Sequence, residues 1–174
     1  MESKIKSTSV FEGSIISVNV DDVISCNGKN VKREIVYHNG GSAIALKNND
    51  NQYYLVRQYR YAQGIDMLEF PAGKLEINEN PLQAIKRECM EELGYSAKNI
   101  QDLGVLVLSG AYLTERIYMY HGIQDQYVGQ NLDDDEQITI ELYTLNQLLT
   151  MVENNIIIDA KTIAMILKIK LLNL

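Results

Sequence analysis

Residues 73–95 read GKLEINENPLQAIKRECMEELGY, and this stretch decides how the rest of the chain is interpreted. Its pattern predicts a helix over 81–93. Asn80 suits the N-cap, Pro81 suits the first helical position, and Gly94 suits a left-handed stop. The helix is unusual because acidic residues crowd toward its C-terminal end.

Three glutamates, Glu88, Glu91 and Glu92, form a stripe beside the apolar face of this helix when residues are placed about 100° apart. Like charges one turn apart oppose a helix by about 0.2–0.5 kcal/mol per pair. A bound cation would relieve the crowding, and hard divalent cations such as Mg²⁺ take carboxylate oxygens. The alternative is a solvated face on which Arg87 pairs with Glu91.

The composition is that of an ordinary globular domain, with 46% apolar and 22% charged residues. A net charge of -7 argues against non-specific binding to nucleic acid or to an anionic membrane. It does not exclude a phosphate substrate, because a divalent cation can bridge two anions. With no apolar signal segment at the start and no apolar run near about 18 residues, we expect a cytoplasmic protein. Cys26 and Cys89 are expected to be reduced.

Two regions of the chain differ in the secondary structure that their residue patterns predict. Residues 1–40 predict a small antiparallel β arm with a hairpin turn at Asn27-Gly28, which must pack on the main domain or on a second chain. Residues 41–174 mix strands with helices and predict an α/β layered domain. The strands expected there are 42–47, 53–60, 67–70, 102–109, 115–123 and 138–144, and the further helices are 145–155 and 159–174.

The stretch at 73–95 fits the pattern G-x5-E-x7-R-E-x-x-E-E-x-G. The chain resembles the Nudix hydrolase family, and this stretch is similar to its signature loop–helix–loop. The resemblance implies a Nudix-type α/β/α sandwich with a mixed sheet, of which residues 1–40 would be an N-terminal extension. The matching residues are Gly73, Glu79, Arg87, Glu88, Glu91, Glu92 and Gly94.

The resemblance also implies roles for these residues. Glu88 and Glu92 would be the principal ligands of Mg²⁺ or Mn²⁺, and the carbonyl of Ala72 an additional ligand. Glu91 would be a further ligand or would hold the metal-bound water, so Glu91 and Glu92 are both expected to be catalytic. A metal at this place polarises phosphoryl oxygens and activates water near neutral pH.

The remaining signature residues are expected to be structural. Glu79 and Arg87 would tie the loop to the helix by a salt bridge, with metal contact by Glu79 as the alternative. Gly73 and Gly94 would allow a tight loop and a helix stop.

Three further segments resemble the ADP-ribose pyrophosphatase branch: VRQYRYAQG at 56–64, LEFPAGKLE at 68–76 and DAKTI at 159–163. This resemblance implies hydrolysis of ADP-ribose to AMP and ribose 5-phosphate by a homodimer joined through the β arm. The alternatives are another nucleotide sugar or a dinucleotide, of the GDP-mannose or NADH type, or a non-catalytic nucleotide-sensing module. The branch's proline-glycine motif appears here as Gly110-Ala111, a departure that bears on the choice of ADP-ribose.

The branch also suggests residues outside the signature. Arg33, Arg57 and Arg60 are candidates for contact with a substrate phosphate, because guanidinium groups bind phosphate through two donors. In the resembled branch, arginines matching Arg57 or Arg60 reach either a substrate phosphate or a neighbouring subunit. The other alternative is that these two residues merely flank a strand end. Glu69 either joins the metal shell or is a hydrogen-bonded acid that holds its loop.

The resemblance to this branch implies a general base in an acidic loop after the signature, which here is NLDDDEQ at 131–137 with Glu136 as the first candidate. Glu115 is the second candidate. His38 and His121 show no pattern that would give them a catalytic role.

Overall fold

The computed structural model describes residues 1–132 and 137–174. The described part of the chain forms two compact units. The first contains Met1–Gly40 and Val107–Arg116, and the second contains Gly41–Leu106 and Ile117–Leu174. The sequence did not indicate that residues 107–116 fold with the N-terminal strands.

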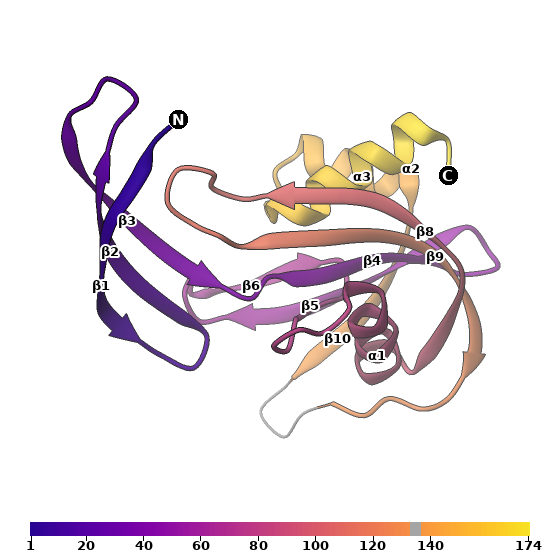
Figure 1. The fold of residues 1–174 in the computed structure, drawn as a ribbon. Helices are drawn as coiled ribbons and strands as arrows, with labels where there is room; N and C mark the ends of the chain where they lie inside the picture. The colour runs from indigo at the N-terminus through magenta and orange to yellow at the C-terminus, as the bar shows by residue number, and fades with distance from the viewer. Residues whose placement is uncertain (133–136) are drawn as a thin grey trace. The chain divides into compact units, whose positions relative to one another are not determined.

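The first unit is built on an antiparallel sheet with the strand order β1 (Ser3–Glu12), β2 (Ile16–Ile24) and β3 (Asn30–His38) (Figure 1). The predicted turn at Asn27-Gly28 lies between β2 and β3, where Gly28 has φ 78°. Every residue of β1 is exposed, so its sequence lacks the alternation of buried and exposed positions from which a strand is predicted. The segment 107–116 joins β3 through a bridge between Val36 and Leu113.

The second unit contains a mixed sheet with the order β10-β5-β4-β9-β8, to which β6 adds beside β5 and β7 beside β4. Strands β4 and β9 run parallel, whereas β4–β7, β5–β6 and β5–β10 run antiparallel. The strands are β4 (Gly41–Lys47), β5 (Gln52–Arg60), β6 (Ile65–Glu69), β7 (Ala72–Lys74), β8 (Tyr95–Val107), β9 (Arg116–Tyr127) and β10 (Ile138–Thr144).

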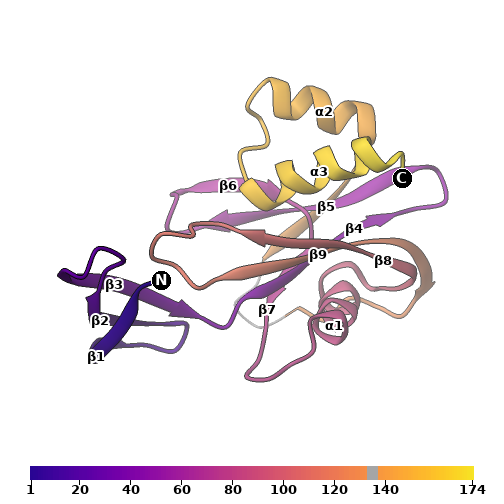
Figure 2. The ribbon, with the colours of Figure 1, turned by 45° about the horizontal axis from the view of Figure 1, so that its top comes forward.

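Helices cover both faces of this sheet (Figure 2). Helix α1 (Pro81–Leu93) packs on one face, where Ile85, Cys89 and Leu93 join Ile44 and Val56 in a buried core. Helices α2 (Leu145–Glu153) and α3 (Ala160–Leu172) pack on the other face over a second core. Because successive strand residues point to opposite faces, neighbouring residues of β4 and β5 contribute to different cores. The predicted α/β/α sandwich is confirmed.

Helix α1 begins and ends where the sequence predicts, whereas α2 ends at Glu153 rather than at 155, and α3 covers Ala160–Leu172 rather than 159–174. Asn80 caps α1 by accepting hydrogen bonds from its first turn, Pro81 is its first residue, and Gly94 ends it with φ 75°. Thr144 and Asp159 are the N-caps of α2 and α3. In the described residues, every helix is too short or too polar to cross a lipid bilayer.

The ring of His121 is buried in the second unit, with 5% of the residue exposed. It lies edge-on to Tyr53 with 6.0 Å between the ring centroids. Its Nε2 atom has no hydrogen-bond partner among the described residues. Burial, assisted by the charge of Lys47, lowers the pKa of His121 to about 4. The folded protein therefore holds this side chain neutral at pH values where the unfolded chain protonates it.

This burial predicts a pH-dependent stability. Because the unfolded state binds the proton from about pH 6.5 downward and the folded state does so only near pH 4, stability is lost as the pH falls through this window. The loss reaches at most about 3 kcal/mol. Urea unfolding from pH 7.5 to 4.5 should show a shallower decline for His121→Gln than for the wild type. Parallel declines in the two proteins would contradict the assignment.

Candidate active site

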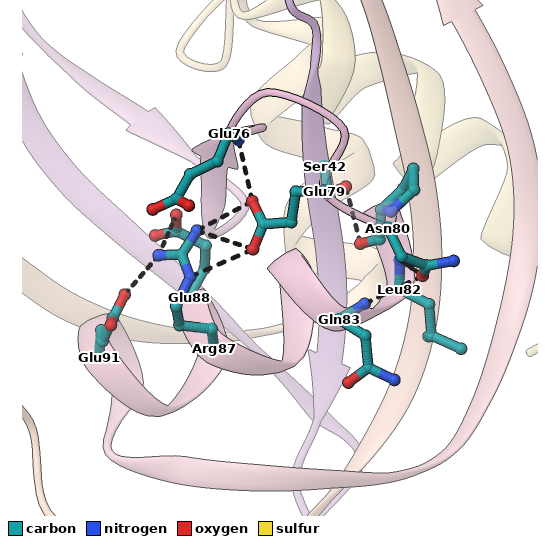
Figure 3. Close-up of polar contacts among 10 residues, drawn as sticks. Ser42, Glu76, Glu79, Asn80, Leu82, Gln83, Arg87, Glu88 and Glu91 are labelled. Atoms are coloured by element: carbon teal, nitrogen blue, oxygen red, sulfur yellow. Dashed lines mark hydrogen bonds and ion pairs between the residues drawn. The ribbon is translucent and has the colours of Figure 1, made fainter.

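The start of α1 is fixed to the sheet and to the preceding loop (Figure 3). Asn80 Oδ1 accepts hydrogen bonds from the N–H groups of Leu82 and Gln83, at 2.9 and 3.3 Å. The hydroxyl of Ser42, a buried residue of β4, donates to the carbonyl of Pro81 at 2.9 Å. The helix therefore presents its glutamates from a rigid support.

Arg87 is the charged centre of the signature stretch (Figure 3). The ion pair expected with Glu79 is present, at 3.4 Å, and Glu79 also accepts a hydrogen bond from the N–H of Glu76. Arg87 Nη1 contacts Glu88 at 2.9 Å and Glu91 at 2.8 Å. Burial alone would lower the pKa of Arg87, but the surrounding carboxylates outweigh it and raise the pKa above its usual value. Arg87 thus joins the loop to the acidic edge of α1.

Strand β7 approaches this edge closely at Gly73. A Cβ atom built on Gly73 would lie 1.8 Å from Glu88 Oε1 and 1.9 Å from its Cδ. A side chain at position 73 would therefore displace the carboxylate of Glu88 from its place beside the strand backbone. The close approach puts the carboxylate of Glu88 against the strand that contains Ala72.

The C-terminal turn of α1 is held by the segment 128–131. Carbonyl groups in the last turn of a helix have no partner within the helix. Here they accept hydrogen bonds that fix the backbone bearing Glu91 and Glu92. These bonds are Val128 N–H to Gly94 O at 2.8 Å, Asn131 N–H to Glu91 O at 3.0 Å and Gln130 Nε2 to Glu92 O at 2.6 Å.

The carboxylates of this edge would have to turn toward a metal ion in order to bind it. Within residues 1–132 and 137–174, no group of three or more His, Cys, Asp or Glu side chains is gathered closely enough to hold a metal. Glu88 and Glu91 nevertheless reach one positive centre, the guanidinium of Arg87. Glu92 is 4% exposed on the same helix. Three carboxylates and the carbonyl of Ala72 are oxygen donors of the kind that Mg²⁺ and Mn²⁺ prefer, so the donor set fits such an ion.

Glu69 is a hydrogen-bonded acid, which was the alternative interpretation of this residue. It is 3% exposed and accepts hydrogen bonds from Arg60, at 2.7 and 3.0 Å, and from Lys161. Burial alone would raise the pKa of Glu69, but the two cations outweigh it and hold the pKa below its usual value. Hydrogen bonds to Glu69 raise the pKa of Arg60, and the charges of Glu92 and Asp159 add to this effect.

Arg57 points to the face of the sheet that α2 and α3 cover, opposite the face that α1 covers. It is paired in register with Leu68, which belongs to the core beneath α2 and α3. Its guanidinium contacts Glu141 of β10, with Nε 2.5 Å from Oε1, and the hydroxyl of Tyr143 donates to the same carboxylate. These contacts give Arg57 a partner in the neighbouring strand, and its contact with substrate stays a prediction.

The other predicted site residues fall outside the second unit or outside the described residues. Arg33 of β3 pairs with Glu2, with 2.6 Å between Nη2 and Oε1. Glu115 Oε1 lies 3.5 Å from Nδ1 of His38. That nitrogen accepts a hydrogen bond from Gly40 N–H, so it carries no proton to donate to Glu115 in this arrangement. Glu136 lies outside the described residues.

Sequence reasoning did not identify Lys161, Gln130 or Glu141 as partners of the site. Each meets its partner across a long separation in the chain, 92 residues for Lys161 and Glu69 and 84 for Arg57 and Glu141. The segment DAKTI was the only part of the sequence that indicated a role for this region. In it, Asp159 caps α3, and Thr162 accepts a hydrogen bond from the N–H of Phe70 at 2.9 Å.

Comparison with known proteins agrees with this geometry. A model of the NUDIX domain matches residues 37–165. The chain is 33% identical to an ADP-ribose pyrophosphatase of Bacillus subtilis (strain 168) over 163 residues, covering 92% of this chain and 88% of the relative. It is 35% identical to a methanol dehydrogenase activator of Bacillus methanolicus over 164 residues, covering 93% and 89% of the two chains.

A GDP-mannose pyrophosphatase of Citrobacter koseri (strain ATCC BAA-895 / CDC 4225-83 / SGSC4696) is 31% identical over 146 residues, covering 78% of this chain and 75% of the relative. A crystal structure of an ADP compounds hydrolase superposes with a TM-score of 0.85 at 18% identity, covering 97% of this chain and 92% of that one. This last likeness concerns the fold alone. With the matched domain and the relatives at 30% identity or more, the chain belongs to the Nudix family of hydrolases.

Proposed function

We propose that the protein hydrolyses the diphosphate bond of ADP-ribose, giving AMP and ribose 5-phosphate, with Mg²⁺ or Mn²⁺ as cofactor. The observation that supports this most strongly is the acidic edge of α1. There the carboxylates of Glu88 and Glu91 both contact the guanidinium of Arg87, close to strand β7. Similarity to ADP-ribose pyrophosphatases of Bacillus subtilis (strain 168) and Mycobacterium tuberculosis (strain ATCC 25618 / H37Rv) favours this nucleotide sugar.

The proposed roles follow from position and chemistry. A bound divalent ion would polarise the diphosphate and acidify a water. Glu88, Glu92 and the carbonyl of Ala72 would hold that ion, and Glu91 would hold the water or complete the ligand set. Other parts of the chain would supply the remaining groups. Arg60 is the first candidate for contact with a phosphate oxygen, followed by Arg33 or Arg57. Glu136 or Glu115 would act as the general base.

The specific substrate is tested by a panel of nucleotide sugars and dinucleotides. We expect ADP-ribose with Mg²⁺ to release AMP at a higher kcat/KM than GDP-mannose or NADH does, measured by chromatography of the products. Preferred turnover of GDP-mannose would contradict the ADP-ribose assignment, and the GDP-mannose pyrophosphatase relatives make it the first rival. Absence of turnover on the whole panel would favour a non-catalytic nucleotide-sensing module.

We also propose that residues 1–40 form an arm that joins two copies of the chain. Strand β1 is exposed along its whole length, and this unit exposes several large apolar side chains. They are Ile5, Val10, Phe11, Ile15, Ile16 and Ile24. A unit that exposes several large apolar side chains is a candidate for an interaction surface. Light scattering should give twice the chain mass of 19.7 kDa, and a monomer would contradict the proposal.

A further inference from the structure

A buried ionic cluster joins the end of β6 to the start of α3. Glu69 lies at its centre, between Arg60 and Lys161. Lys161, whose side chain is 12% exposed, also lies 3.0 Å from Asp159. Two positive and two negative charges balance within the cluster. This balance matters because an uncompensated charge at a buried position is strongly unfavourable.

The geometry of Arg60 leaves part of its guanidinium available. Nε and Nη2 donate to the two oxygens of Glu69, at 2.7 and 3.0 Å. A guanidinium has five N–H donors, so this contact uses one edge of it. Among the described residues, none is seen to accept a hydrogen bond from Nη1 of Arg60, and the side chain is 38% exposed. The other end of the guanidinium, which carries Nη1, is therefore oriented by Glu69 and accessible to an anion.

This end of Arg60 belongs to the face of the sheet that α1 covers. Glu69 pairs in register with Val56, which lies in the core beneath α1. Arg60 follows Val56 by an even number of residues on β5 and so points to the same face. The charge of Glu92 acts on Arg60, which places the guanidinium within electrostatic range of the acidic edge.

We propose that Lys161 and Glu69 are positioning residues that hold Arg60 so that its free end receives a phosphate oxygen of the substrate. The inference rests on the proposed function and deepens it, because it explains how an arginine beside the acidic edge is prepared for a diphosphate. Lys161 itself does not touch substrate in this arrangement. Its loss would leave Glu69 and Asp159 with a single cation, so the cluster would become net negative and would draw Arg60 away from the position in which its free end meets a phosphate oxygen.

The first test is Lys161→Met in the full-length protein, assayed with ADP-ribose and Mg²⁺. We expect KM to rise roughly ten- to hundredfold, because a misplaced binding group costs about that much, while kcat changes less. Lys170→Met is the matched control, since it makes the same replacement at an exposed position of the same helix and should leave KM and kcat unchanged. Lys161→Gln, which retains a donor for Glu69, should show a smaller rise in KM and provides a second variant if the first unfolds.

A double-mutant cycle separates positioning from general stability. If Lys161 acts through Arg60, adding Lys161→Met to Arg60→Ala should raise KM by less than about twofold further. If the increases in KM of the two single variants instead multiply in the double variant, the inference is overturned. Turnover by the wild type tests the proposed function by itself, so the two failures are distinguishable. Calorimetric binding of ADP-ribose with a methylene in place of the bridging oxygen should repeat the same pattern in Kd without any turnover.

Discussion

Replacing Glu92 with glutamine is expected to lower kcat/KM for the diphosphate substrate by about a thousandfold or more, with the fold retained. Glutamine has nearly the same shape but no negative charge, so the loss falls on metal binding and on charge stabilisation during the reaction. Glu92 is 4% exposed, and its backbone carbonyl is held by Gln130. The variant should therefore keep its helix while losing the charge that the chemistry requires.

The measurement is steady-state turnover over a range of Mg²⁺ concentrations, together with thermal unfolding followed by circular dichroism. Gln83→Ala is the matched control, because Gln83 is an exposed residue of the same helix, and its turnover should equal that of the wild type. Turnover within about threefold of the wild type in Glu92→Gln would remove Glu92 from the proposed ligand set.

Replacing Gly73 with alanine is expected to lower kcat/KM by about a hundredfold, with little loss of stability. The added Cβ would occupy the position of the Glu88 carboxylate, at 1.8 Å from Oε1. A glutamate side chain is flexible, so it can swing away at a small free-energy cost. The cost to function is large because the displaced carboxylate is a proposed ligand.

This prediction is checked by comparing Gly73→Ala, Glu88→Gln and the double variant in the same assay. Because both single changes remove one carboxylate from one place, the double variant should be little worse than either single variant. Full activity in Gly73→Ala, with a normal unfolding midpoint, would show that the position of Glu88 is unimportant.

The features that local sequence determines could be predicted. The N-cap at Asn80, the start at Pro81 and the stop at Gly94 depend on the conformational preferences of single residues, and helix 81–93 was placed correctly. Strand β8 begins at Tyr95, several residues before the expected start at 102, because most of it lacks a clear apolar alternation. Strand β7 was missed because three residues are too few to show a period.

The features that depend on tertiary contacts could not be predicted. The sequence left two roles open for Glu69, and the contact with Lys161 that favours the hydrogen-bonded acid comes from a distant helix. The partner of Arg57 depends on the register of β5 with β10, where Leu55 is opposite Glu141. Folding of 107–116 with the N-terminal strands likewise depends on contacts that no local pattern encodes.

The central claim is that the acidic edge of α1 binds a divalent ion that faces a diphosphate. It is tested most directly by a crystal structure with Mg²⁺ and the methylene-bridged analogue of ADP-ribose. The account predicts Mg²⁺ bound by oxygens of Glu88, Glu92 and the Ala72 carbonyl, with Arg60 on a phosphate oxygen. Mg²⁺ and analogue bound elsewhere, with Glu88 and Glu91 still paired to Arg87, would contradict it.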